Sequence, residues 1–205
     1  MTLVPALAAF VAAAILITVT PGLDTALVLR TGAVEGPRRG ALTALGVCCG
    51  LMVWGLAVAL GLGVLLAASH AAYLALQLAG AAYLIWLGAG LILRPRSKLD
   101  LRPQPRARGN WWLRGFLNNL LNPKVGVFYV SFLPQFVPAG VPPAPFIVLL
   151  AAIHFVIGIG WLGLIAASTA PLKRWLANAR AVRWLDRVTG AVFVGFGLRL
   201  AFDRR

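Results

Sequence analysis

Six apolar runs, separated by short polar or basic segments, are the feature of this sequence that most constrains its fold. They cover about residues 3–30, 40–67, 72–93, 111–136, 146–169 and 188–202. A helix needs about 20 apolar residues to cross the hydrocarbon core of a bilayer. With 60% hydrophobic and only 12% charged residues, a water-soluble fold could not bury this much apolar surface, because soluble domains are usually about a quarter charged. The sequence therefore predicts an all-α integral membrane protein with several spans.

The last run is short for a span. It crosses a membrane only if its helix begins earlier, near Val182, and if Arg199 extends outward to the interface. The basic segment before it, from Lys173 to Arg187, suits either a short helix on the inner membrane face or a plain loop. We expect six spans, and five spans plus an interfacial helix are the alternative.

The positive charges lie in the gaps between the runs, although the formal net charge is +14. The first, third and fifth connections are basic, whereas the second and fourth carry no fixed charge. Because basic loops remain in the cytoplasm, the odd connections are predicted to be cytoplasmic and both termini to lie outside. Arg204 and Arg205 conflict with this orientation, but three basic loops outweigh one tail. No nucleic-acid motif or basic face with interleaved aromatic residues is present, so nucleic acid is not a predicted partner.

Two of the runs are interrupted by a proline next to a charged residue. The first interruption is Thr20-Pro21-Gly22-Leu23-Asp24, and the second is Asn122-Pro123-Lys124. In both, a good N-cap residue precedes a proline, which is the pattern of a helix start with proline in its first position. Each half of the chain therefore begins with a predicted broken helix, followed by two further spans.

An odd number of spans in each half inverts the second half relative to the first. Many secondary transporters are built on this plan and bind their substrates at paired broken helices. We therefore predict one transmembrane domain over residues 1–205, made of two inverted three-helix repeats at about 1–94 and 111–205. A cytoplasmic loop at about 95–110 joins them, and the first helix of each repeat is broken at a proline.

The two breaks also predict the functional site. A helix that begins within a membrane exposes unpaired N–H groups and the positive end of its dipole, which must face protein, water or a ligand. Asp24 and Lys124 add one charge of each sign, which is what a zwitterionic amino acid requires. Ionisable groups within the membrane are costly and usually functional. The alternative is that Pro21 and Pro123 only kink two helices, and that the charges pair to hold them.

The predicted substrate-binding residues are the polar and special residues of the breaks, with two nearby amides: Thr20, Pro21, Gly22, Asp24, Gln77, Asn118, Asn122, Pro123 and Lys124. Gln77 would equally well bridge two helices. The predicted proton-coupling groups are Asp24, the only acid within the runs, and His154, the only histidine within a run. A buried histidine bonded to a backbone carbonyl is the alternative reading of His154.

Several chemistries have no motif in this chain. It contains no G-x-x-x-x-G-K-[ST] phosphate loop and no H-E-x-x-H or C-x-x-C metal pattern. We therefore predict no enzymatic activity, no cofactor and no metal. Cys48 and Cys49 are adjacent in an apolar run and are predicted to be small buried residues rather than a disulfide. The spacing Gly46-x-x-x-Gly50 predicts close helix packing.

Five stretches carry a family resemblance: 20–24, 36–46, 79–88, 115–124 and 132–136. Over nearly its whole length the chain resembles the LysE/RhtB family of bacterial amino-acid exporters, most specifically around Asn122-Pro123-Lys124. Many relatives have Pro-Gly-Pro-Asn where this chain has Pro-Gly-Leu-Asp, so Asp24 puts a carboxylate in place of an amide.

The resemblance implies a multi-pass protein of the bacterial cytoplasmic (inner) membrane. It implies a secondary transporter that exports amino acids or related small zwitterions and is driven by protons, with membrane lipids as its surroundings. A passive channel for small polar solutes and an intramembrane enzyme are the alternatives. The family name leaves open which amino acid is carried, the coupling stoichiometry, and whether the chain forms a homo-oligomer.

Overall fold

The computed structural model describes residues 2–68, 70–95, 109–167 and 178–202, and these residues form helices without a strand. The all-helical prediction is therefore confirmed for the described part of the chain. The elements in chain order are α1 (Leu3–Val19), α2 (Leu23–Val34), α3 (Pro37–Ala68), α4 (His70–Leu93), α5 (Trp111–Leu120), α6 (Pro123–Phe132), the 3-10 turn η1 (Leu133–Phe136), α7 (Pro143–Ala167) and α9 (Ala179–Phe202).

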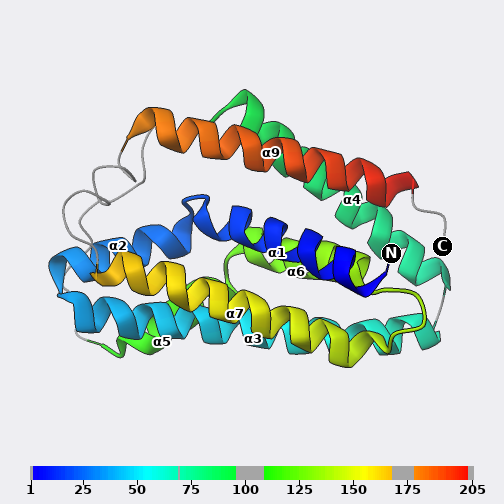
Figure 1. Cartoon of the computed structure of the whole chain (residues 1–205), viewed down its shortest axis with the longest axis horizontal. Helices are drawn as coiled ribbons and strands as arrows, with labels where there is room; N and C mark the ends of the chain where they lie inside the picture. The colour runs from blue at the N-terminus through cyan, green and yellow to red at the C-terminus, as the bar shows by residue number, and fades with distance from the viewer. Residues whose placement is uncertain (1, 69, 96–108, 168–177, 203–205) are drawn as a thin grey trace.

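The long helices form the two outer edges of the molecule, and the short helices other than α5 lie between them (Figure 1). Helices α4 and α9 pack side by side along one edge, and α3 packs against both α7 and α5 along the other. The short helices α1, α2 and α6 occupy the middle. Helix α1 begins at the same end of the molecule as α9 ends, whereas α2 ends and α3 begins at the opposite end.

Both predicted helix breaks are present. Helices α1 and α2 are bent by 52° across the first break. At the second break, the Asn122 side chain caps α6 by accepting a 3.1 Å hydrogen bond from the Lys124 N–H, and Pro123 takes the first helical position. This part of the cap prediction is confirmed.

The cap prediction is wrong at the first break. Thr20 ends α1, Gly22 is the N-cap of α2, and Pro21 precedes that cap instead of opening the helix. The physical reason is that the Thr20 hydroxyl donates to the Leu16 carbonyl at 2.7 Å. The side chain is thus bonded back to α1 and makes no bond to the amides of α2.

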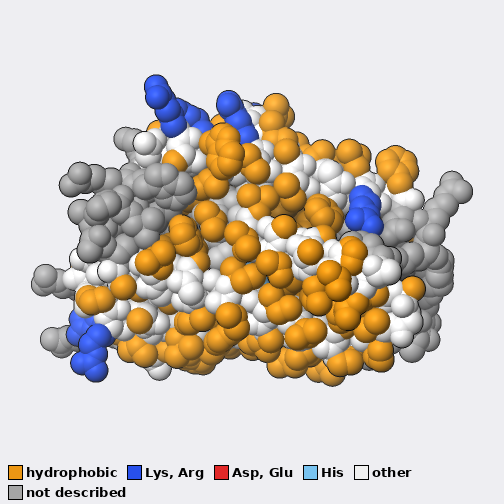
Figure 2. Space-filling model, viewed as in Figure 1, with side chains coloured by type: hydrophobic (Ala, Val, Ile, Leu, Met, Phe, Trp, Pro, Cys, Tyr) orange, Lys and Arg blue, Asp and Glu red, His pale blue; other side chains and the backbone are white. Residues whose placement is uncertain are grey.

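Within the described residues, α3 and α7 are each long and apolar enough to cross a membrane, and the bent pair of α1 and α2 would be a third span. Figure 2 shows apolar side chains over most of the visible face, with described Lys and Arg side chains toward the ends of the long axis. These features define a membrane protein. The count of six spans stays a prediction.

The last helix begins at Ala179, so the prediction that it starts well before residue 188 is confirmed. From there to Arg187 the basic segment belongs to α9, and a separate inner-face helix over these residues is wrong. Asp186 lies outside the six apolar runs of the sequence, yet it is fully buried within α9. Asp24 is therefore not the only acid inside the helical body. The predicted loop at about 95–110 and residues 173–177 lie mostly or wholly outside the described residues.

Small residues allow the helices around the site to approach closely. A Cβ atom added to Gly46 would collide with the backbone of Trp112, and one added to Gly115 would collide with that of Thr43. Helices α3 and α5 therefore touch through their backbones, and the predicted close packing at Gly46 and Gly50 is confirmed. Both cysteines are free; Cys48 is buried, as predicted, whereas Cys49 is only half-buried.

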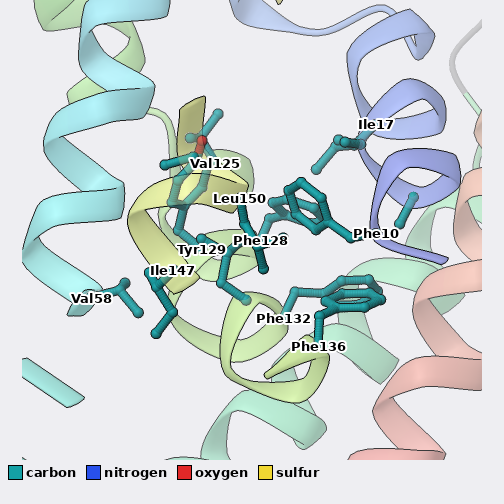
Figure 3. Packing of buried hydrophobic residues seen from close by; sticks show 14 of the residues in the cluster. Phe10, Ile17, Val58, Val125, Phe128, Tyr129, Phe132, Phe136, Ile147 and Leu150 are labelled. Carbon is teal, nitrogen blue, oxygen red and sulfur yellow. The ribbon is translucent and has the colours of Figure 1, made fainter. Parts of the chain in front are cut away.

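A cluster of buried aromatic rings joins the middle helices to α9 (Figure 3). Phe10 of α1 meets Phe136 of η1 edge-on, with ring centroids 5.4 Å apart. The rings of Phe132 of α6 and Phe193 of α9 also pack together, with their centroids 6.1 Å apart. Such ring pairs fix the lateral positions of α1 and α6, and the two helix breaks lie at the ends of these helices.

The α4–α9 contact generates a stability prediction. A Cβ atom on Gly88 would lie 2.6 Å from the Gly190 carbonyl oxygen, and one on Gly190 would lie 2.5 Å from that of Gly88. Gly88→Leu should therefore destabilise the fold by about 1–3 kcal/mol, as overpacking does. We expect the apparent melting temperature of the purified protein in detergent to fall by several degrees. Gly90→Leu on the same helix is the control, because nothing lies within 4 Å of a Cβ atom there. Equal losses in both variants would contradict the packing account.

Candidate functional site

The two helix breaks meet near the centre of the molecule. Asp24 is the second residue of α2, and Lys124 is the second residue of α6. A Cβ atom on Gly22 would lie 3.7 Å from the Lys124 ammonium nitrogen. Because Gly22 has no side chain, the lysine of one break can reach the backbone of the other. The facing arrangement expected from the matched sequence pattern is therefore present.

Asp24 is held by three asparagine side chains. Asn118 Nδ2 donates to Asp24 Oδ1 at 2.6 Å, and the Nδ2 atoms of Asn119 and Asn122 both donate to Asp24 Oδ2 at 3.0 Å. All three donors come from the end of α5 and the cap of α6. Hydrogen bonds to an ionised group are about twice as strong as neutral ones. This shell of amides therefore solvates the carboxylate inside the protein.

Lys124 is held by backbone groups at the end of α1, on the other side of the first break from Asp24. Its Nζ atom donates to the backbone carbonyls of Ile17 and Thr20, each at 3.1 Å. The last carbonyls of a helix have no intrahelical partner and form the negative end of its dipole. The ammonium group thus satisfies the end of α1, while the Asp24 carboxylate lies at the positive end of α2.

Helix α9 also reaches the first break. The hydroxyl groups of Thr20 and Thr189 are hydrogen-bonded to each other, and both side chains are buried. Thr189 was not among the predicted residues, because no local pattern relates it to Thr20. This contact connects the outer α4–α9 pair to the residue whose carbonyl binds Lys124.

His154 of α7 bridges three helices. Its Nε2 atom is 3.0 Å from the Thr18 hydroxyl of α1, and its Nδ1 atom is 3.1 Å from the Tyr129 hydroxyl of α6. Both partners are side chains, so the alternative in which His154 binds a backbone carbonyl is not what the structure shows. The ring is buried and extends a polar chain from the site into the aromatic cluster.

A cavity of about 50 Å³ lies where these groups converge. It has room for a few water molecules, or for one small charged group such as an ammonium or a carboxylate. Six of the predicted residues line it: Thr20, Gly22, Asp24, Asn122, Lys124 and His154. Its remaining wall is largely apolar and includes Leu51, Phe128 and Leu162.

The other predicted residues have different positions. Asn118 binds Asp24 without lining the cavity, Pro21 is buried beside the break, and Pro123 is exposed toward a second cavity. Gln77 lies in α4, and its side chain is outside the described part of the structure.

Sequence reasoning missed Asn119 as a site residue. It is fully buried between Asp24 and α3, where a Cβ atom on Gly50 would meet its side chain. The signal was the amide-rich order Asn118-Asn119-x-x-Asn122, in which three donors follow one another within about one helical turn. Among the described residues, no group of three or more His, Cys, Asp or Glu side chains could hold a metal ion.

This geometry defines a class of protein: an all-helical membrane protein in which two broken helices bring an acid and a base to a small interior cavity, as in secondary transporters. Comparison with known sequences identifies the family. The chain belongs to the family of LysE type translocators, whose model matches residues 15–204.

Named relatives are similar over nearly their full lengths. The chain is 28% identical to the threonine efflux protein of Salmonella typhi over 190 residues, covering 90% of this chain and 92% of the relative. It is 29% identical to the leucine efflux protein of Klebsiella pneumoniae over 197 residues, covering 94% and 92%. An uncharacterized membrane protein of Pseudomonas aeruginosa is 31% identical over 201 residues, covering 94% and 93%. No solved structure matches the chain.

The double role of Asn122 generates a prediction. Asn122 caps α6 and also binds Asp24, whereas Asn110 only caps α5, by accepting from the Leu113 N–H. Loss of an N-cap costs about 0.5–2 kcal/mol, and loss of a hydrogen bond to a charged group costs about 1.5–3 kcal/mol. Asn122→Ala should therefore lower the melting temperature clearly more than Asn110→Ala. Equal effects in a thermal unfolding assay would show that the bond to Asp24 contributes little.

Proposed function

We propose that this protein exports amino acids or related small zwitterions from the bacterial cytoplasm across the inner membrane, in exchange for protons. The observation that carries the proposal is that Asp24, held by three amides, and Lys124, held by two carbonyls, line the same cavity. Relatives named for the efflux of threonine, leucine and homoserine support an amino-acid cargo.

The substrate's two charges correspond to the two charges of the site. Its ammonium group replaces amide donors on Asp24, and its carboxylate replaces the Ile17 and Thr20 carbonyls on Lys124. The exposed N–H groups at the start of a half-helix add further attraction for the carboxylate. Both charged groups have hydrogen-bond partners within the protein. Binding is therefore an exchange of partners, which permits release as well as capture.

Proton coupling follows if Asp24 takes either a proton or the substrate's ammonium group. A protonated carboxyl group is neutral and no longer attracts a cation, so the proton and the substrate compete for one position. This competition is what exchange requires. His154 is the second candidate for a proton carrier, because it lines the same cavity and is hydrogen-bonded to Thr18 and Tyr129.

The proposal includes one transmembrane domain of six spans over residues 1–205, built from two inverted repeats. Reciprocal contacts support the repeat. Gly55 of α3 faces Ala151 of α7, and Gly158 of α7 faces Cys48 of α3. The same separation along the chain relates Gly55 to Gly158 and Cys48 to Ala151. A two-fold relation between the halves generates such paired contacts, as it does in symmetric dimers. Gly88 and Gly190 make a similar reciprocal contact at a chain separation that is one residue shorter.

Two other functions make different predictions. A passive channel would show unsaturable flux that runs only down a gradient, whereas an exporter would show saturable flux against one. An intramembrane enzyme would consume its substrate continuously as purified protein. Transport assays in proteoliposomes, combined with product analysis, separate the three.

The coupling role of Asp24 leads to the next prediction. Asp24→Asn preserves the shape and the polarity of the side chain but cannot exchange a proton. We expect this variant to lose accumulation of substrate driven by an imposed pH gradient, while downhill exchange of substrate remains. The measurement is uptake into inverted membrane vesicles with and without the gradient. Glu35→Gln is the control, since Glu35 lies at the end of α2 and pairs with Arg39.

Two results would redirect this hypothesis. If Asp24→Asn still concentrates substrate in response to the gradient, coupling belongs to another group, with His154 as the next candidate. If Asp24 and Lys124 only hold the helices together, each single neutralisation should lower stability. The double variant Asp24→Asn, Lys124→Met should then recover transport.

Lys124 provides a separate prediction about binding. Lys124→Met removes the cation proposed to bind the substrate carboxylate, and hydrogen bonds to charged groups contribute about 1.5–3 kcal/mol. Substrate affinity should fall about tenfold to a hundredfold. Ligand-induced thermal stabilisation of the purified protein measures this change. Arg39→Met, which removes an exposed cation, should leave affinity unchanged. Near-normal affinity in Lys124→Met would make Lys124 a structural residue only.

A further inference from the structure

A second cavity, larger than the first and more open to the surface of the molecule, lies beside α6. It has a volume of about 540 Å³ and is formed between α3, α4 and the α5–α6 break. Its lining includes Trp54, Ala79, Tyr83, Asn122, Gly126 and Ser131. The proposed binding site at Asp24 does not include it.

The two cavities share one residue, Asn122. On the side of the central cavity its Nδ2 atom donates to Asp24, and its Oδ1 atom accepts from the Lys124 N–H. On the other side it faces the second cavity. Asn122 thus forms part of the wall between them. A substrate that replaces its bond to Asp24 frees this side chain to move.

The lining of the second cavity indicates what would fit there. Apolar residues predominate, and none of the described residues that line it is charged. The Trp54 indole N–H is buried and has no hydrogen-bond partner, although a buried donor normally has one. The Trp54 ring lies against Gly126, where a Cβ atom would come within 2.8 Å of it. A cargo with a neutral side chain and an acceptor oxygen suits such a space, whereas a cationic side chain would find no acidic partner in it.

At the equivalent position of the first break, α9 is hydrogen-bonded directly to the break. The chain separation that relates Pro21 to Pro123 and Gly88 to Gly190 also relates Thr20 to Asn122 and Thr189 to Leu87. Thr189 of α9 is hydrogen-bonded to Thr20. Its counterpart Leu87 in α4 has no polar side-chain atom that could bind Asn122. Helix α9 is thus bonded to one break, while a cavity separates α4 from part of the other.

We propose that the second cavity is the passage through which a neutral amino acid leaves the central site. This inference rests on the proposed export function and adds the route and the class of cargo. The cavity follows α6 from Asn122 as far as Ser131, toward the end of the molecule where α1 begins (Figure 1). The predicted orientation places this end outside the cell. Cargo moves past Asn122 once its ammonium group has displaced that amide from Asp24.

The test blocks the passage without touching the central site. Ala79 lines the second cavity and is exposed, and Ala82 is exposed on the same helix without lining it. In proteoliposomes, Ala79→Phe should reduce the flux of leucine by about tenfold or more, since each tenfold corresponds to about 1.4 kcal/mol of added barrier. Thermal stabilisation by leucine should remain. Ala82→Phe should transport leucine like the unchanged protein. In the unchanged protein and in both variants, lysine should compete poorly with leucine.

The outcomes are distinct. Normal leucine flux in Ala79→Phe, equal loss in Ala82→Phe, or loss of binding together with flux would each overturn the passage. Preferential transport of lysine would overturn the assigned cargo class. If the unchanged protein neither binds nor moves any amino acid, the proposed export function fails instead.

A labelling experiment tests the cavity without relying on transport. In a variant with Cys48 and Cys49 replaced by alanine, Ala79→Cys should react with a membrane-impermeant thiol reagent added from outside, and leucine should slow the reaction. Absence of labelling would overturn the outward passage even if export itself is confirmed.

Discussion

The structure depends on the way in which two helix ends are satisfied inside the protein. Helix α1 stops at Val19, and its last carbonyls need hydrogen-bond donors that lipid cannot supply. Lys124 supplies them from the other half of the chain. Asp24 likewise receives its donors from the end of α5 and the cap of α6. The second half of the chain therefore supplies the donors both for carbonyls at the end of α1 and for the carboxylate that follows the first break.

This mutual dependence requires the half-helices to be held accurately, and small residues provide that accuracy. Gly50 lets Asn119 lie against α3 and still reach Asp24, and Gly22 leaves room for the Lys124 side chain. Helix association in membranes relies on such close packing, because lipid tails are as apolar as the side chains and exert no hydrophobic force between helices. Here the same glycines both bring helices together and position the charged groups.

Much of this could be predicted from the sequence, and the remainder could not for physical reasons. Proline and charge inside apolar runs indicated both breaks, and the cap at Asn122 was correct because an N-cap is a local interaction. The role of Thr20 was wrong, because its hydroxyl had two local choices and bonded backward to Leu16. The bond from Thr189 to Thr20 and the cavity at Trp54 arise from long-range packing of α9 and α4, which no local pattern encodes.

The two breaks are alike in sequence pattern but differ in their surroundings, and this difference bears on how the protein works. If the halves were related by perfect symmetry, α4 and α9 would approach their breaks in the same way. Instead α9 is hydrogen-bonded at Thr20, while a cavity of about 540 Å³ opens beside Asn122. Inverted repeats permit the two halves to exchange conformations, which moves access from one side of a fixed site to the other. Because Gly88 and Gly190 hold α4 and α9 in close contact, a shift of this pair that closed the cavity at α6 would also separate Thr189 from Thr20. In the proposed exporter, a movement of this helix pair would therefore act on both breaks at once.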